Sequence, residues 1–286
     1  MKKSLGPGYF CTPTLEEAFK KAQELNIDGF EFMLTGAKNN PLYITYESDE
    51  NTYAQIRKLC EIYGIEAHSV TTTHYNTTGA SFGSPKGSEK YNEALKILRK
   101  QLECAKGIGA DAILVVTNID PETGYLESIE NTIATFRELE DEIKEIGVNI
   151  GIENITNHFF MSPLDVKYVI EKIDNPLVGF YFDAGNVLEF SPIDYWIDTV
   201  GKYIKKVHIK DFKRNFDEWD IYNVGGTWPD LLEGDMDFEL LVKKLQAVGY
   251  DGFLSAEVGN SKEGRTQEQF VIDLSNQLEK IVSFAK

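Results

Sequence analysis

Short apolar runs alternate with amphipathic segments along the chain. The run VGFYFDAGNV at 178–187 is apolar or aromatic up to Phe182 and then continues with a carboxylate, Asp183. The segment TPTLEEAFKKAQELNIDG at 12–29 begins with a threonine that can cap a helix, and its apolar side chains recur every three or four positions. The first pattern is typical of a buried strand and the second of an amphipathic helix.

The same two patterns repeat from one end of the chain to the other. We expect strands at 8–11, 29–34, 65–75 (with its exit loop), 111–118, 149–155, 178–186, 205–212 and 253–259. We expect helices within 12–29 and at 53–64, 89–109, 128–146, 162–173, 237–249 and 266–286. Repeated strand–helix units favour a parallel sheet, and eight of them in a chain near the ~250 residues of a typical barrel favour a (β/α)8 TIM barrel of the α/β class.

The domain organisation follows from the continuity of this pattern. No linker rich in Ser, Gly or Pro divides the chain, so we expect residues 1–286 to form one barrel domain. A doubly wound sheet is the alternative fold. It is disfavoured because no GxGxxG motif opens the first strand–helix turn.

The charge balance limits the kinds of molecule that this chain is expected to bind. Lys and Arg number 29 against 46 Asp and Glu, which gives a net charge of −17. Such a chain repels polyanions, so we expect no nucleic-acid partner. A small phosphorylated substrate remains possible, because a single basic side chain or a helix N-terminus can hold one phosphate.

Location is suggested by the cysteines and by the N-terminal sequence. Cys11, Cys60 and Cys104 are too few and too widely spaced for a disulfide framework or a CxxC metal site, so we expect free thiols. The start MKKSLGPGYF has no apolar core behind its lysines, and no apolar run reaches the ~20 residues that cross a bilayer. We therefore expect a cytoplasmic protein without a membrane partner.

Four successive strands in the second half end in polar side chains. These residues are Glu153 in NIGIEN, Asp183 in FYFDAGN, His208 in KVHIKD and Glu257 in LSAEVG. The chemistry of a TIM barrel lies at the C-terminal ends of its strands. We therefore expect these four side chains to point into one barrel mouth.

Three carboxylates gathered without a cation would repel one another and raise one another's pKa values. A divalent metal ion removes that conflict. Three oxygen ligands and one imidazole suit Mn²⁺, Mg²⁺, Co²⁺ or Zn²⁺, and the oxygen content favours Mn²⁺ or Mg²⁺. Each residue alone has a simpler explanation: Glu257 as a cap or ion-pair partner, His208 as a structural histidine, and Asp183 as a turn cap.

The residues at these strand ends resemble the xylose-isomerase-like superfamily of sugar isomerases and epimerases. The similar motifs are IGIEN, FDAGN, VHIKDF and the block LEGDMDFELLVKKLQAVGYDGFLSAEV. The segment THYNTTGASFGSP at 73–85 and the Asn in FDAGN are most similar to the branch of ketopentose- and ketohexose-phosphate 3-epimerases. Within the superfamily, these motifs are more specific for the fold and the metal site than for the substrate.

The resemblance implies a mononuclear metal site of Glu153, Asp183, His208 and Glu257, with manganese favoured. It also implies that Glu153 and Glu257 are the catalytic acid/base pair. The metal would bind the ketose carbonyl and the adjacent hydroxyl. One glutamate would remove the C3 proton to give an enediolate, and the other would return a proton from the opposite face. An aldose–ketose isomerase could use the same groups between C1 and C2.

The DNA-repair branch of the same superfamily, the AP endonucleases, is the rival that we disfavour. It is similar in fold but uses three zinc ions and many more histidines than the four present here. Asn186 stands where the repair enzymes have a ligand histidine, and the net charge of −17 opposes DNA binding.

Four further residues are candidates for substrate binding. His74 follows the third strand, His158 lies in the loop after the fifth, and Ser84 precedes a helix whose N-terminus could accept a phosphate. Lys210 lies on the same side of its strand as His208 and could contact a substrate phosphate or Asp183. Glu31 is expected to be a polar residue of the barrel mouth without a direct chemical role.

Three hypotheses therefore remain open for the function. The first is a metal-dependent 3-epimerase or isomerase of a ketose or ketose phosphate. The second is an isomerase or dehydratase acting on a free sugar, an inositol derivative or a hydroxy acid. The third is a non-catalytic sugar-binding barrel. We expect a small-molecule sugar or sugar phosphate as partner, and the resemblance suggests a homodimer or homotetramer.

Overall fold

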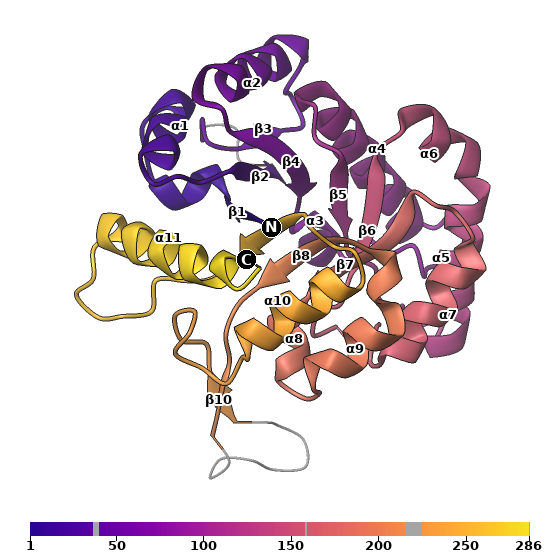
Figure 1. Cartoon of the computed structure of the whole chain (residues 1–286). Helices are drawn as coiled ribbons and strands as arrows, with labels where there is room; N and C mark the ends of the chain where they lie inside the picture. Colours follow the sequence, from indigo (N-terminus) through magenta and orange to yellow (C-terminus); the bar gives the residue numbers. More distant parts are fainter. Residues whose placement is uncertain (37–39, 158, 216–224, 286) are drawn as a thin grey trace.

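Eight parallel strands close into a barrel in the computed structural model, which describes residues 1–36, 40–157, 159–215 and 225–285 (Figure 1). The strands pair in the order β1-β11-β8-β7-β6-β5-β4-β2, and β2 pairs with β1 to close the ring. Their bounds are β1 Lys2–Leu5, β2 Gly29–Thr35, β4 Glu66–Thr71, β5 Ala112–Val115, β6 Asn149–Glu153, β7 Val178–Asp183, β8 Ile204–Ile209 and β11 Phe253–Ala256. The predicted (β/α)8 barrel is confirmed.

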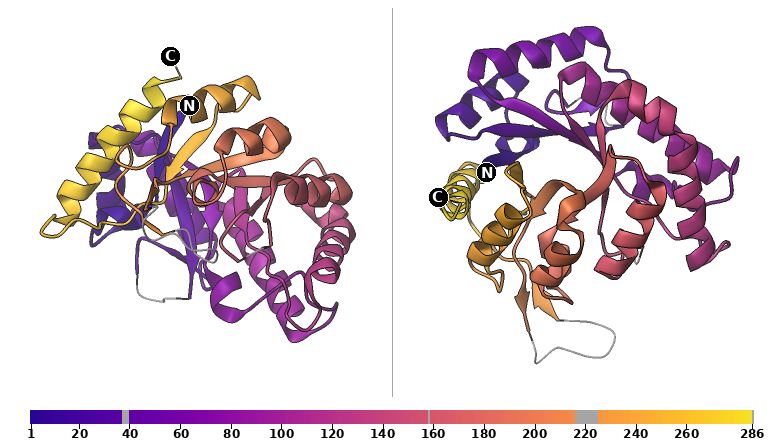
Figure 2. Two further views of the ribbon diagram at one scale, coloured as in Figure 1. Left: turned by 90° about the horizontal axis from the view of Figure 1, so that it is seen from below. Right: turned by 45° about the vertical axis from the view of Figure 1, so that its right-hand side comes forward.

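Helices surround the barrel on its outer face (Figure 2). The longer ones are α1 Leu15–Glu24, α2 Glu50–Tyr63, α4 Glu89–Ile108, α5 Tyr125–Glu138, α7 Pro163–Ile173, α9 Ile193–Val200, α10 Phe238–Ala247 and α11 Gln267–Ser283. The shorter elements are α3 His74–Thr78, α6 Glu140–Ile146, α8 Ala184–Leu188, the 3-10 helices Pro7–Phe10 and Gly201–Tyr203, β3 Ile44–Thr45, and the hairpin β9 Lys213–Arg214 and β10 Gly226–Thr227.

The first strand lies earlier in the chain than the sequence pattern predicts. The expected strand at 8–11 is instead largely a 3-10 helix, Pro7–Phe10, because Pro7 has no N–H for a strand ladder and fits the first turn of a helix. The first strand is Lys2–Leu5, and the apolar pattern did not indicate it because it begins with two lysines. Lys3 is buried, and its ammonium pairs with Glu279 at 2.8 Å, which brings the N-terminal strand beside α11.

Two helices also differ from the prediction. The helix expected at 128–146 is divided at Leu139 into α5 and α6. The helix α9 between β7 and β8 was not predicted at all. Its residues Ile193, Trp196, Ile197 and Val200 are buried, and Trp196 stacks on Phe180 of β7 at 6.1 Å between ring centroids. The apolar face of α9 therefore covers the outside of the barrel at β7.

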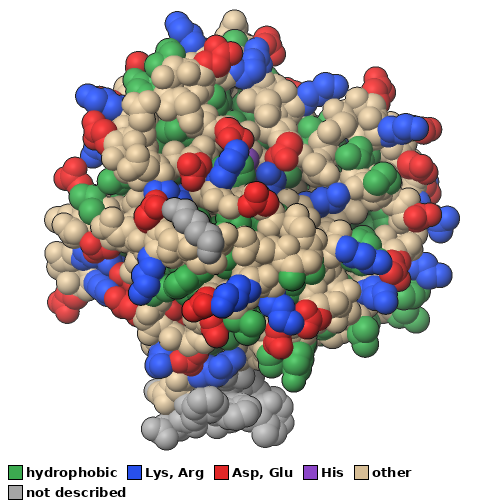
Figure 3. All heavy atoms as spheres, in the orientation of Figure 1, with side chains coloured by type: hydrophobic (Ala, Val, Ile, Leu, Met, Phe, Trp, Pro, Cys, Tyr) green, Lys and Arg blue, Asp and Glu red, His purple; other side chains and the backbone are tan. Residues whose placement is uncertain are grey.

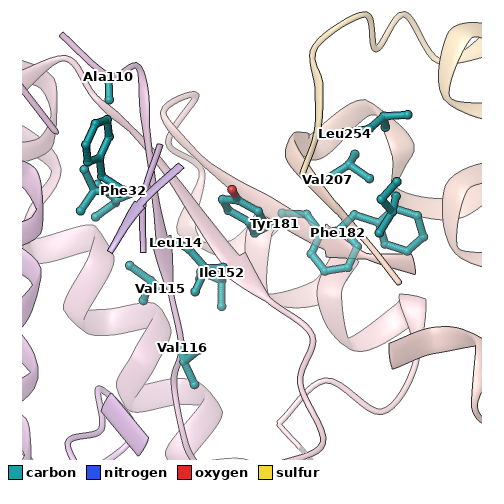
Figure 4. Close-up of a cluster of buried hydrophobic side chains, with 14 of the residues drawn as sticks. Phe32, Ala110, Leu114, Val115, Val116, Ile152, Tyr181, Phe182, Val207 and Leu254 are labelled. Carbon is teal, nitrogen blue, oxygen red and sulfur yellow. The ribbon is translucent and has the colours of Figure 1, made fainter. Parts of the chain in front are cut away.

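Alternation along each strand separates the barrel interior from the helix layer. Phe182 of β7, Val207 of β8 and Leu254 of β11 form one row across the sheet and are buried (Figure 4). The residues next to this row, Tyr181 of β7 and His208 of β8, point to the other face, into the barrel, where their ring centroids lie 4.8 Å apart. Residues two positions apart share a face, so Asp183 joins Tyr181 on the interior side.

The continuity of the barrel bears on the number of domains. Barrel strands run from β1 at the N-terminus to β11, and the last helix returns to β1, where Ser275 Oγ donates to Leu25 O and Glu279 pairs with Lys3. We therefore propose, as the sequence suggests, that residues 1–286 form one domain. Among the described residues, no helix combines the length and the apolar character that crossing a bilayer requires.

His68 lies in the barrel interior and makes stability depend on pH. Its Nε2 is hydrogen-bonded to Ser4 Oγ at 2.5 Å, its ring stacks on Phe253, and among the described residues its Nδ1 has no hydrogen-bond partner. Burial, followed by the charge of Lys206, holds the pKa of His68 well below 6.5. The unfolded chain therefore binds a proton here that the folded protein does not bind.

We expect the free energy of unfolding to fall as the pH is lowered below 6.5, by up to about 1.4 kcal/mol per pH unit from this residue. Urea unfolding of wild type and His68→Gln between pH 7.5 and pH 5 measures the effect. The variant is expected to be less stable at pH 7.5 but to lose stability more slowly on acidification. Equal pH slopes for the two proteins would show that His68 does not contribute.

Candidate metal centre

The polar ends of β6, β7, β8 and β11 meet at the barrel mouth, as the sequence predicts. Glu153, Asp183, His208 and Glu257 each offer one ligand atom, and all four atoms lie within 4.8 Å of one another. The sheet register explains this convergence. His208 pairs directly with Asp183 of β7 on one side and with Ser255 of β11 on the other. Glu257 follows Ser255 by two residues. The structure brings the four residues together, and their role as ligands stays a prediction.

The imidazole of His208 lies between two carboxylates. Its Nδ1 is 3.0 Å from Glu153 Oε1 and its Nε2 is 2.8 Å from Glu31 Oε1. Burial lowers the pKa of His208, but the charges and hydrogen bonds of Glu31 and Glu153 outweigh it and hold the pKa well above 6.5. Burial raises the pKa of Glu153 to about 7.

Glu31 contacts the candidate metal centre, although the sequence analysis assigned it no direct chemical role. It is only 13% exposed, and it accepts hydrogen bonds from His208 and from the buried hydroxyl of Tyr181. A carboxylate on the far ring nitrogen fixes the orientation and the protonation of a ligating histidine. The available signal was a charged residue inside the apolar strand GFEFML.

The ammonium of Lys210 lies between two other carboxylates. Its Nζ is 2.8 Å from Asp183 Oδ2 and 2.5 Å from Glu257 Oε2. Burial lowers the pKa of Lys210, but these two charges outweigh it and hold the pKa well above its usual value. Burial raises the pKa of Glu257, but His208 and Lys210 outweigh it and lower the pKa to about 2. This placement confirms that Lys210 shares the inner face with His208.

Asp183 provides a test of whether the site fits a metal ion. Its side chain is fully buried; Oδ1 accepts the N–H of Asn186 at 2.8 Å, and Oδ2 lies 2.8 Å from the ammonium of Lys210. A buried carboxylate is costly unless it faces a cation, and carboxylate oxygens are the ligands that hard divalent ions take. The donor set of three carboxylates and one imidazole therefore fits a divalent ion.

Two asparagines hold the strand ends in register. Asn154 donates its side-chain N–H to Asp183 O and accepts the N–H of Asp183, both at 2.9 Å. Asn186 donates in turn to Asn154 O at 3.0 Å. The motifs IGIEN and FDAGN are thus linked to each other, which fixes the positions of Glu153 and Asp183. The sequence contained these residues but gave no sign that they bond to each other.

A cavity of about 570 Å³ opens above these residues. Its polar lining includes Glu31, Glu153, His208, Lys210 and Glu257, and its apolar lining includes Leu5, Met33 and Leu114. Ligand pockets for small molecules typically measure about 300–1,000 Å³. The cavity can therefore hold a monosaccharide against Glu153, His208 and Glu257, whereas Asp183 is fully buried and is not among its described lining residues.

The other predicted substrate residues do not all reach this cavity. His74 is not among the described residues that line it; its ring nitrogens bond to Gly36 N–H at 3.0 Å and to Tyr46 Oη at 2.8 Å. Ser84 is also absent from that lining and donates to the buried Asp120 at 2.6 Å, because this carboxylate needs donors. His158 lies outside the described residues.

Two relatives are similar to this chain over most of its length. An uncharacterized protein of Methanocaldococcus jannaschii is 24% identical over 276 residues, which cover 92% of this chain and 85% of the relative. A ketose 3-epimerase of Arthrobacter globiformis is 23% identical over 258 residues, which cover 86% of this chain and 78% of the enzyme.

Solved structures support the fold. A D-tagatose 3-epimerase-like protein has a TM-score of 0.73 at 18% identity, with 100% of this chain and 98% of that chain covered. A xylose isomerase-like TIM barrel protein from Mycobacterium smegmatis, in complex with magnesium, has a TM-score of 0.71 at 16% identity, covering 100% and 97%. The IOLI protein with a bound zinc atom has 0.71 at 15%, covering 100% and 98%.

The comparison with protein families matches most of the barrel. The family described as xylose isomerase-like TIM barrel matches residues 19–276, from the first helix to the last. This range contains all four residues of the candidate metal centre. The chain therefore belongs to the xylose isomerase-like TIM barrel family.

Proposed function

We propose that this protein is a divalent-metal-dependent epimerase that inverts C3 of a ketose. The observation that carries the proposal is the convergence of ligand atoms from Glu153, Asp183, His208 and Glu257 within 4.8 Å of one another, with all but Asp183 lining a sugar-sized cavity. The relationship to a ketose 3-epimerase supports the reaction type. The family relationship and the donor set support the need for a metal.

Strand order supports a two-glutamate mechanism. Glu153 ends β6 and Glu257 follows β11, and β7 and β8 lie between these strands, so the two carboxylates flank Asp183 and His208. One glutamate removes the C3 proton and the other returns a proton from the opposite face, which inverts the carbon. A bound divalent ion would supply Lewis-acid stabilisation of the enediolate that forms between these two steps. Manganese or magnesium is favoured by the three carboxylates.

The charges around the cavity favour an unphosphorylated ketose. Among its described lining residues, His208 and Lys210 are the basic ones, and both are already paired with carboxylates. Glu31, Glu153 and Glu257 contribute negative charge to the same walls. The described lining therefore offers a phosphate dianion no basic side chain that is not already paired. The phosphorylated alternative that the sequence suggested has no comparable support here.

Self-association is the remaining part of the proposal. Large apolar side chains are exposed on and near α7 and α9, namely Leu164, Tyr168, Phe190 and Tyr195. Hydrophobic side chains gather along the lower right edge in Figure 3, where Figure 1 places these helices. An exposed apolar patch is a common feature of subunit contacts. The homodimer or homotetramer stays a prediction.

Proton exchange tests the function. The purified protein is loaded with Mn²⁺ and incubated in D2O with D-tagatose and D-fructose, and NMR follows each carbon. We expect deuterium at C3 together with the C3 epimer. Exchange at C1 or C2 would indicate aldose–ketose isomerisation, and loss of water would indicate a dehydratase. Sugar binding without exchange at any carbon would indicate a binding protein.

Glu31 gives a prediction about metal affinity. Glu31→Gln keeps the size of the side chain but weakens the acceptor for His208, so the affinity for Mn²⁺ is expected to fall about 10–100-fold in titration calorimetry. Glu66→Gln is the control, because Glu66 is an exposed residue at the start of β4 that pairs with Lys2. An unchanged affinity in Glu31→Gln would mean that this carboxylate does not orient the histidine.

A further inference from the structure

Lys210 lies on the same oxygen atoms that are predicted to bind the metal. Its Nζ is 2.8 Å from Asp183 Oδ2 and 2.5 Å from Glu257 Oε2, and its side chain is 16% exposed. Three carboxylates so close together would repel one another without a cation. One ammonium group therefore supplies positive charge between two of them.

The position of this lysine is set by its neighbours. A Cβ atom at Gly185 would come within 2.1 Å of Lys210 Cγ, so only glycine allows the lysine stem to pass α8. On the other side, Nζ lies 5.5 Å from the centre of the Trp228 ring. The glycine two residues after Asp183 in the motif FDAGN thus makes room for the counter-charge of that aspartate.

Space is available for the ammonium group to move. A second cavity of about 270 Å³ is lined by Lys210, Trp228, Pro229, Glu257 and Val258. Its aromatic wall can attract a cation through the ring face. Lys210 itself lines this cavity, and a lysine stem has several rotatable bonds through which Nζ can change its position.

We propose that Lys210 is an internal counter-cation that holds Asp183 and Glu257 in place until a divalent ion binds, and that then releases their oxygens by moving toward Trp228. This inference rests on the metal site of the proposed function. The inference predicts the direction in which Lys210 changes the metal affinity. Because the metal must displace a positive charge, Lys210 lowers metal affinity while it stabilises the folded site without metal.

Neutral variants test this exchange. Lys210→Met is expected to bind Mn²⁺ at least about tenfold more tightly than wild type in titration calorimetry, because a nearby repelling charge is gone. Its melting temperature is expected to be lower than that of wild type without metal and close to it with saturating Mn²⁺. Lys210→Arg keeps the positive charge and is therefore expected not to bind Mn²⁺ more tightly than wild type.

Lys206 provides a matched control on the same strand. It is also buried and ion-paired, with Asp111 at 2.6 Å, which precedes β5 at the opposite end of the barrel. Lys206→Met is expected to lower the melting temperature equally with and without Mn²⁺ and to leave the affinity for Mn²⁺ unchanged. It separates the loss of a buried ion pair from the loss of a charge at the metal site.

The possible outcomes distinguish this inference from the proposed function. If wild type binds no metal, the proposed function fails. If wild type binds Mn²⁺ and Lys210→Met binds it equally or more weakly, only the counter-cation is overturned. A Lys210→Met protein that folds only with Mn²⁺ would be the strongest form of the expected result. If neither Lys210→Met nor Lys210→Gln folds even with Mn²⁺, the metal cannot replace the lysine and the inference is wrong.

Discussion

Glu153→Gln is expected to reduce deuterium exchange at C3 of a ketose by about 10³-fold or more. Glu153 is 7% exposed, and its carboxylate lies 3.0 Å from His208 Nδ1, so no other described acidic side chain holds the same position. The amide can neither accept the C3 proton nor replace the negative charge at the metal. General acid–base catalysis alone contributes about 10²–10⁴-fold, and loss of a ligand adds to this effect.

The measurement is C3 exchange in D2O at saturating Mn²⁺, with the metal content of each sample determined by elemental analysis. Glu257→Gln is expected to behave similarly, since the second glutamate supplies the other proton. Glu239→Gln is the control, because Glu239 is an exposed residue of α10 that pairs with Lys243. Exchange at the wild-type rate in Glu153→Gln would remove this residue from the mechanism.

Asp183→Asn is expected to reduce the bound metal from one ion per chain to almost none. Asp183 is completely buried, and its Oδ2 lies 2.8 Å from the ammonium of Lys210. The amide keeps the shape of the side chain, and its oxygen can still cap α8 by accepting the N–H of Asn186. The change removes one negative charge from the centre of the ligand set and leaves Glu257 as the ion-pair partner of Lys210, so we expect the fold to be retained. Elemental analysis after dialysis, together with circular dichroism, measures both properties.

Asp211 offers the matched comparison for Asp183. It is also fully buried, but its oxygens accept the backbone N–H groups of Phe212, Gly234 and Met236 at 2.8–3.0 Å. Asp211→Asn is expected to lower the free energy of unfolding by about 1–3 kcal/mol and to retain one metal ion. If Asp183→Asn keeps its metal, or if both variants lose it equally, the aspartate is not a specific ligand.

Local periodicity explains why much of the site was predictable. The alternation of side chains along a strand depends only on neighbouring residues, so FYFDAGN and KVHIKD show directly that Asp183, His208 and Lys210 face inward. The spacing of strand–helix units then predicts that consecutive strand ends meet at one mouth. The same periodicity did not predict β1, because its lysines looked exposed. The partner that allows Lys3 to be buried, Glu279, lies at the other end of the chain.

The sequence by itself determined the barrel, its strand faces and the four polar strand ends, because these depend on short-range periodicity. Only the tertiary structure decided which polar side chains contact each other. Glu31 bonds to His208, and Lys210 lies between Asp183 and Glu257. Ser84 donates to Asp120 and does not line the cavity. Each of these contacts joins strands or loops that are distant in sequence. Barrel closure brings them together, and no local pattern records which polar groups then meet.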